Sequence, residues 1–188
     1  MRKLLYLFLN DFSSEDIDLF NERMHKVKTW CTSEFQRRGR NIQLLGRWKA
    51  TELRLFLLYA GPSVLKGIVS EEAYNHFLLL HFAMTILVSP SLNSEQSSFA
   101  RNLLVRFVNT FETLYGEENL IFNVHSLIHL ADDCDFFEAP LDTFACFTFE
   151  NALGKLKRQL RGRRTVVAQL KGIRIRLRFN LLKTVIHS

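Results

Sequence analysis

The sequence predicts a mainly all-α fold, an irregular bundle of about six helices. Apolar side chains recur at helical spacing through most long segments, and capping or terminating residues mark the segment ends. Of the 188 residues, 47% are hydrophobic and 23% are charged, which suits one globular domain with a substantial core. The longest apolar stretch, Phe77–Val88, is too short to span a bilayer, so we expect a soluble protein without membrane contact.

The first two elements are a core segment and an amphipathic helix. Residues 4–9 are apolar and follow two basic residues, but the run is short for a signal peptide and no small-residue cleavage site follows. We therefore expect a core segment and a protein that is not secreted. Residues 13–30 predict a helix with Ser13 and Ser14 as cap candidates. Its apolar face consists of Ile17, Phe20, Met24 and Val27.

Two apolar helices are expected in the middle of the chain. The first begins near Trp48 and is predicted to stop at Gly61 and Pro62, because glycine ends helices and proline cannot continue them. The second begins after Ser70 as N-cap and ends before Pro90. It is apolar nearly all round, which predicts a central buried helix. The expected contacts are Phe77, Leu80, Met84 and Leu87 packed against Phe107 and Phe111.

Three further helices and one strand complete the expected order. Residues 93–116 form the fourth helix, residues 123–133 a shorter fifth, and residues 147–162 a sixth with Thr148 as cap. The predicted apolar stripe of the fourth helix is Phe99, Leu103, Phe107, Phe111 and Leu114. Residues 172–179 alternate apolar and basic side chains, which is typical of a strand, although no partner strand is evident.

The stretch "NVHSLIHLADD", residues 123–133, brings together four side chains that bind metals in many proteins. On a helix, His125, His129 and Asp132 or Asp133 share one face, which makes them candidate metal ligands. The other interpretation, which we favour, is a buried, hydrogen-bonded histidine pair at a helix junction, with the aspartates capping the next turn. The stretch lacks the glutamate that follows the first histidine in zinc metalloproteases, so a zinc hydrolase ranks third among the functions considered.

Charge is distributed very unevenly along the chain. Residues 151–188 contain eleven of the 25 basic residues and no acid, so they carry +11, while the first 150 residues carry all 19 acids and a net −5. Such a segment predicts a polyanionic partner, and DNA is the expected one. The alternatives are a solvated face or a tail folded onto the acidic body. The densest group of cations is Lys155, Lys157, Arg158, Arg161, Arg163 and Arg164.

Several enzyme classes lose support from missing motifs. The sequence contains no glycine-rich phosphate loop, no GxSxG elbow and no CxxC pair. Its three cysteines, Cys31, Cys134 and Cys146, are odd in number and widely spaced, which favours a reducing compartment over a disulfide framework.

The order of three segments resembles the C-terminal part of CACTA (En/Spm)-type transposases, including transposon-derived proteins of animals. These segments begin at Trp48, Leu114 and Leu141 and include "NVHSLIHLADD" and "FENALGKLKR". The resemblance covers roughly residues 15–170. We expect residues 1–170 to form a single transposase-derived helical domain, followed by a basic tail at 171–188. It implies an RNase H-like core in which three carboxylates hold two Mg²⁺ ions in the full-length family enzyme. Those enzymes are several times longer, so the earlier acids are expected upstream of this chain.

The resemblance makes Glu150 the candidate third carboxylate of the catalytic set. It precedes the cations that are predicted to bind DNA. The other interpretation is that Glu150 only stabilises the positive end of its own helix. One carboxylate cannot assemble a two-metal centre, so the fragment is expected to bind DNA without a cofactor and without catalysis. If the protein is expressed, the resemblance implies a nuclear location. Without the resemblance, we expect a cytoplasmic location. The alternative function is a helical protein-interaction or structural module without DNA binding.

Overall fold

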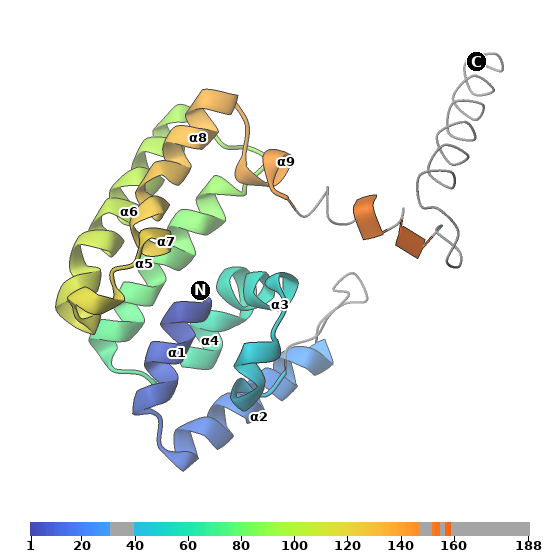
Figure 1. Ribbon diagram of the computed structural model, residues 1–188, viewed down its shortest axis with the longest axis vertical. Coiled ribbons are helices and arrows are strands. Elements are labelled where there is room, and N and C mark those ends of the chain that lie inside the picture. Colours follow the sequence, from blue (N-terminus) through green and yellow to red (C-terminus); the bar gives the residue numbers. More distant parts are fainter. Residues whose placement is uncertain (31–39, 147–151, 155–156, 159–188) are drawn as a thin grey trace. The chain divides into compact units, whose positions relative to one another are not determined.

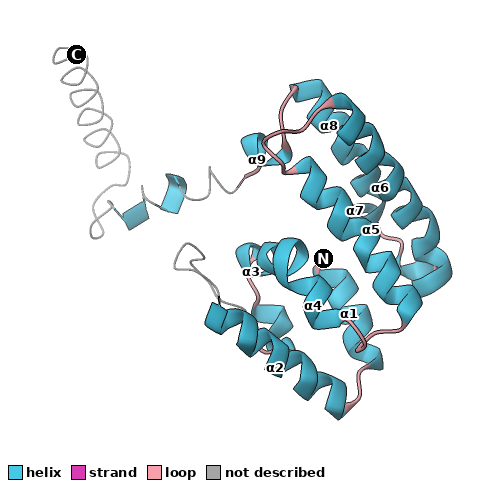
Figure 2. Cartoon of the chain, turned by 180° about the vertical axis from the view of Figure 1, so that it is seen from behind, coloured by secondary structure: helices cyan, strands magenta, loops and turns pink. Residues whose placement is uncertain are grey.

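The computed structural model describes residues 1–30, 40–146, 152–154 and 157–158 (Figure 1). These residues form helices and connecting loops without a strand, which confirms the mainly all-α prediction for this part of the chain (Figure 2). The chain divides into two compact units, Met1–Thr143 and Phe144–Ser188. Most of the predicted sixth helix and the whole predicted strand at 172–179 lie outside the described residues. Residues 144–170 of the predicted domain belong to the second unit.

Helices α1 (Arg2–Asp11) and α2 (Ser14–Trp30) begin the first unit. Leu4, Leu5 and Phe8 are buried, so the N-terminal segment belongs to the core as predicted. A reciprocal cap begins α2, because Asp16 N donates to Ser13 Oγ at 3.1 Å and Ser13 N donates to Asp16 Oδ2 at 3.0 Å.

The predicted stop at Gly61 and Pro62 is wrong, because the chain remains helical through both residues. After the 3₁₀ segment η1 (Ile42–Arg47), α3 (Ala50–Leu55) is followed by a π-helical turn, η2 (Phe56–Ala60), and by α4 (Gly61–Leu65). The amide of Gly61 donates to the carbonyl of Phe56, five residues back. Pro62 stands in the first turn of α4, directly after this wider turn.

Gly61 allows α4 to approach α5 (Glu71–Leu87) closely. A Cβ atom at this position would overlap Cζ of Phe77 and would lie 2.9 Å from the carbonyl oxygen of Phe56. Phe77 and Phe56 are both fully buried, and their ring centroids are 6.3 Å apart. The glycine therefore serves close packing rather than helix termination.

Helices α5 and α6 (Ser94–Tyr115) lie side by side and antiparallel in Figures 1 and 2. Ser70 caps α5 as predicted, since its side chain accepts from Ala73 N at 3.2 Å. Asn93 and Gln96 form a reciprocal cap at the start of α6, and Gly116, with φ of +88°, ends it. The α6 side chains that are buried are Ser97, Ala100, Leu104, Phe107, Val108 and Phe111.

Two burial predictions for this helix pair are confirmed on one side of each helix and wrong on the other. Helix α5 is not buried all round, because α6 and the neighbouring helices cover only one side and leave Phe82 51% exposed. The predicted stripe of α6 is correct at Phe107 and Phe111, which are buried, and wrong at Phe99, which is 57% exposed. Ala100 and Leu104 are buried as well. The aromatic ring that stacks on Phe107 comes from His76, with centroids 4.2 Å apart.

The predicted fifth helix consists of three shorter elements. These are α7 (Phe122–His125), the 3₁₀ turn η4 (Ser126–His129) and α8 (Leu130–Phe137), preceded by a further 3₁₀ turn, η3 (Glu117–Asn119), and followed by α9 (Leu141–Phe144). Helix α8 packs along α6 and buries Ala131 and Cys134. Among the described helices, none has the length and apolar character needed to cross a membrane.

Candidate functional sites

His125 and His129 are exposed, so the predicted buried histidine pair is wrong. Their rings are in edge contact, with centroids 6.0 Å apart, and the side chain of His129 is 59% exposed. The change from α7 to the 3₁₀ turn η4 alters the register after His125, and Val124 and Ala131 face the core in place of the histidines.

The neighbouring aspartates serve a contact between helices rather than a ligand cluster. Arg101 Nε on α6 donates to Asp132 Oδ1 at 2.9 Å, and Arg101 Nη2 donates to Asp135 Oδ2 at 2.7 Å. The pKa of Asp135 is lowered mainly by a hydrogen bond from the Ser97 side chain and, to a smaller extent, by the hydrogen bond from Arg101. The hydrogen bonds from Arg101 to Asp135 and Asp132 raise the pKa of its guanidinium. The bridge thus ties α6 to α8 with charge-assisted hydrogen bonds.

The four predicted metal ligands are not gathered around one point in this structure. Asp133 is exposed, and the closest approach of Asp132 to His129 is 3.5 Å, between Oδ2 and Nδ1. Within the described part of the chain, no group of three or more His, Cys, Asp or Glu side chains is placed to hold a metal ion. His125, His129, Asp132 and Asp133 are therefore near one another in sequence without forming a ligand set.

The predicted catalytic and DNA-binding positions fall mainly outside the described residues. Lys157 and Arg158 are helical and exposed, which leaves both side chains accessible to a phosphate backbone. Glu150 and the remaining cations of the predicted group lie outside the described residues; these cations are Lys155, Arg161, Arg163 and Arg164.

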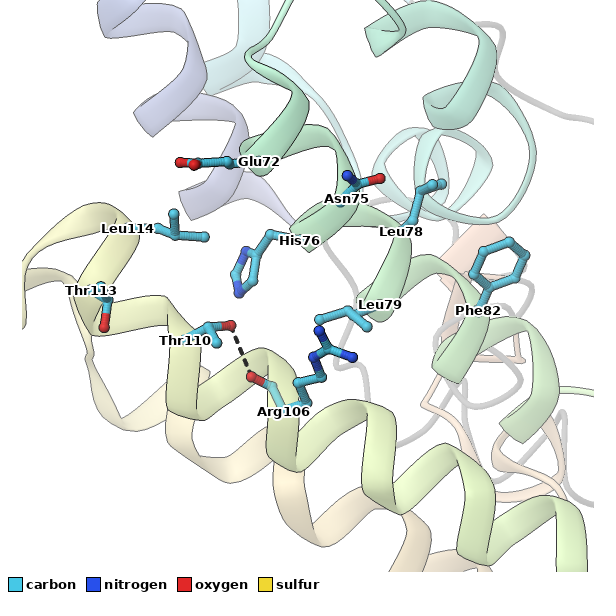
Figure 3. Close-up of a pocket in the computed structure, with 10 residues that line it drawn as sticks. All are labelled: Glu72, Asn75, His76, Leu78, Leu79, Phe82, Arg106, Thr110, Thr113 and Leu114. Atoms are coloured by element: carbon cyan, nitrogen blue, oxygen red, sulfur yellow. Dashed lines mark hydrogen bonds between the residues drawn. The ribbon is translucent and has the colours of Figure 1, made fainter.

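A groove between α5 and α6 is a candidate site that the sequence did not predict. Its volume is about 690 Å³, and Figure 3 shows side chains of both helices around it. One wall carries Leu78, Leu79 and Phe82 from α5, while Arg106 and Thr110 belong to the opposite wall on α6. The remaining lining residues are Glu72, Asn75, His76, Thr113 and Leu114. The groove therefore combines an apolar wall with one acidic and one basic side chain, Glu72 and Arg106.

His76 reaches from α5 towards α6 at the floor of this groove (Figure 3). Its Nε2 lies 2.8 Å from the Phe107 carbonyl oxygen, and its Nδ1 lies 3.1 Å from the Tyr115 hydroxyl. Because a carbonyl only accepts, this geometry assigns the proton to Nε2 and makes Nδ1 an acceptor from Tyr115. Burial lowers the pKa of His76, although the hydrogen bond with Phe107 opposes this effect, and burial also raises the pKa of Tyr115. The neutral pair joins the two helices that form the groove.

No family model, curated protein or solved structure matches the chain. The groove, the Arg101 bridge and the basic segment are therefore the features from which a function is inferred.

Proposed function

We propose that the chain is a transposase-derived helical domain that binds duplex DNA and does not cleave it alone. The observation that carries this proposal is the acid-free segment 151–188 with a charge of +11, next to a body of net charge −5. A dense group of lysines and arginines neutralises phosphates and releases condensed counterions, which drives binding with little sequence selectivity. A nuclear location belongs to the same proposal.

The charges of the first unit support this assignment. Arg101 binds Asp132 and Asp135, Arg54 binds Asp142 at 2.7 Å, and Arg40 binds Glu52 at 3.0 Å. These arginines are engaged by carboxylates within the body, whereas Lys157 and Arg158 are exposed. A phosphate backbone would therefore meet accessible positive charge at Lys157 and Arg158.

Binding to duplex DNA should be strongly salt-dependent. About four phosphate contacts give a slope of log K against log salt near −3.6, which corresponds to a loss of about 150-fold in affinity between ~50 and ~200 mM salt. Replacing Lys157 and Arg158 by glutamine should reduce the magnitude of this slope by about 1.8, since each lost contact removes about 0.9. Fluorescence anisotropy of a labelled duplex across a salt titration measures both quantities.

A matched control changes the same charge on the helical body. Lys28 and Lys66 are exposed, and replacing both by glutamine should leave the slope within experimental error. Absence of binding by the unaltered chain at low salt would reject the DNA proposal in favour of the interaction-module alternative.

The bound DNA should remain intact when Mg²⁺ or Mn²⁺ is added. A two-metal mechanism needs several carboxylates around the phosphodiester, and Glu150 supplies only one of them. A nicking assay on supercoiled plasmid tests this expectation, with Glu150→Gln as the control. Nicking by the unaltered chain that disappears in Glu150→Gln would show a working nuclease and would contradict the proposal.

A helical protein-interaction module is the second candidate function. The observation that favours it is the exposure of large apolar side chains, such as Phe82, Phe122 at 81% and Phe136 at 82%. Exposed aromatic side chains are frequent at protein contacts. DNA binding and a protein contact involve different parts of the chain, so each is tested separately.

A further inference from the structure

The groove between α5 and α6 exposes apolar surface of α5. Phe82 is 51% exposed, and Leu78 and Leu79 beside it are only half-buried. The helix carries apolar residues on all sides, and helices of this type are normally covered all round. Within the described residues, the helices around α5 cover the side that carries Phe77, Leu80 and Leu87 and leave the groove open.

The two ionisable side chains of opposite charge in the groove are available for a partner. Glu72 contributes from α5 and Arg106 from α6 (Figure 3). Both are exposed, and the ion pairs found among the described residues involve neither of them. The groove therefore presents one negative charge, one positive charge and an apolar surface, all within one patch.

We propose that this groove is the contact surface of a homodimer. Glu72 of one copy pairs with Arg106 of the partner subunit, and Arg106 pairs in turn with Glu72 of the partner subunit. Phe82 packs against the apolar wall of the partner subunit's groove. The proposal is independent of DNA binding, because it concerns side chains of the first unit only.

Charge complementarity selects a second copy as the occupant. A two-fold contact uses the same patch on both subunits, so the patch must carry both members of each interacting pair. Glu72 and Arg106 meet this requirement, and two such pairs form per dimer. A partner with a single sign of charge would leave either Glu72 or Arg106 without an opposite charge in the contact, which is unfavourable.

Sedimentation equilibrium of the full chain under reducing conditions tests the proposal. The unaltered chain should form a concentration-dependent dimer at micromolar concentration, and Phe82→Glu should be monomeric at the same concentration, because it places a charge in the apolar contact. Glu72→Arg and Arg106→Glu should each weaken dimerisation more than about tenfold through like-charge contacts. The double variant carrying both reversals restores opposite charges and should return to within about threefold of the original dissociation constant.

Two controls distinguish loss of this dimer contact from unfolding and from nonspecific association of exposed apolar side chains. Phe136→Glu changes an aromatic side chain that is even more exposed but lies outside the groove, so the dimer should persist. Circular dichroism verifies that each variant retains its helical content. A monomeric unaltered chain across the concentration range would overturn the proposal, and so would charge reversals whose double variant is no better than the single ones.

Discussion

Replacing Gly61 by alanine should lower the free energy of unfolding by about 3 kcal/mol, because the core around this residue has no room for a methyl group. The added Cβ would overlap Phe77 and press on the Phe56 carbonyl oxygen, 2.9 Å away. Phe77 and Phe56 are fully buried, so neither can move into solvent to relieve the overlap. Alanine favours helix over glycine by about 1 kcal/mol, which offsets only part of this cost. Urea denaturation followed by circular dichroism measures the change.

Gly154 provides the matched control. It is also helical, but among the described residues a Cβ atom at Gly154 would meet nothing within 4 Å. Gly154→Ala should therefore leave the stability of the first unit unchanged. Equal stability of Gly61→Ala and the unaltered chain would show that α4 and α5 separate easily, contrary to the packing described above.

Helix boundaries that depend on local chemistry were predictable from the sequence. Ser13 and Ser70 cap helices through hydrogen bonds to backbone amides three residues later, and Gly116 adopts the positive φ that ends α6. Each signal acts within one turn of the helix it caps. Such signals can be read without knowing what packs against the helix.

The features that depend on tertiary contacts were not predictable. Glycine followed by proline usually ends a helix, but here the contact with Phe77 and the π turn at Phe56–Ala60 retain the helix through Gly61. Helical spacing alone did not show which side of α5 its neighbours would cover, so a helix buried all round was expected. The predicted burial of His125 and His129 failed for a related reason, since the 3₁₀ turn Ser126–His129 changed the register.

The groove was not predictable because its walls come from two helices that are separated by a loop. Glu72 and Arg106 are distant in sequence, and only the antiparallel pairing of α5 and α6 brings them to one patch. The basic segment, by contrast, is visible in the sequence because its charge is a property of composition.

The Phe82→Glu variant separates the proposed dimer from the proposed DNA binding. It should lose the dimer, while each basic segment should retain the same slope of log K for DNA binding against log salt. In the dimer, two linked basic segments would raise the apparent affinity for DNA through effective concentration.

Replacing Arg40 by methionine should lower the free energy of unfolding by about 3 kcal/mol, because it leaves a buried carboxylate without its cation. Glu52 on α3 is only 1% exposed, and its Oε1 lies 3.0 Å from Arg40 Nε. Its Oε2 accepts a hydrogen bond from Lys49 N at 2.8 Å, which caps α3 but does not neutralise the charge. Arg40 itself is partly exposed, with 36% of its side chain accessible, so the expected cost lies at the lower end for a broken buried pair.

Two further variants identify the unpaired charge as the cause of this loss. Arg40→Lys retains a cation near Glu52 and should lose less than half as much stability as Arg40→Met. The double variant Arg40→Met with Glu52→Met removes both charges, and it should recover most of the loss, because replacing both members of a buried pair by apolar residues is often close to neutral. The lost cap at Lys49 N limits the recovery by about 1 kcal/mol. If the double variant were less stable than Arg40→Met alone, the stabilising role of Glu52 would lie in capping α3 rather than in its pairing with Arg40.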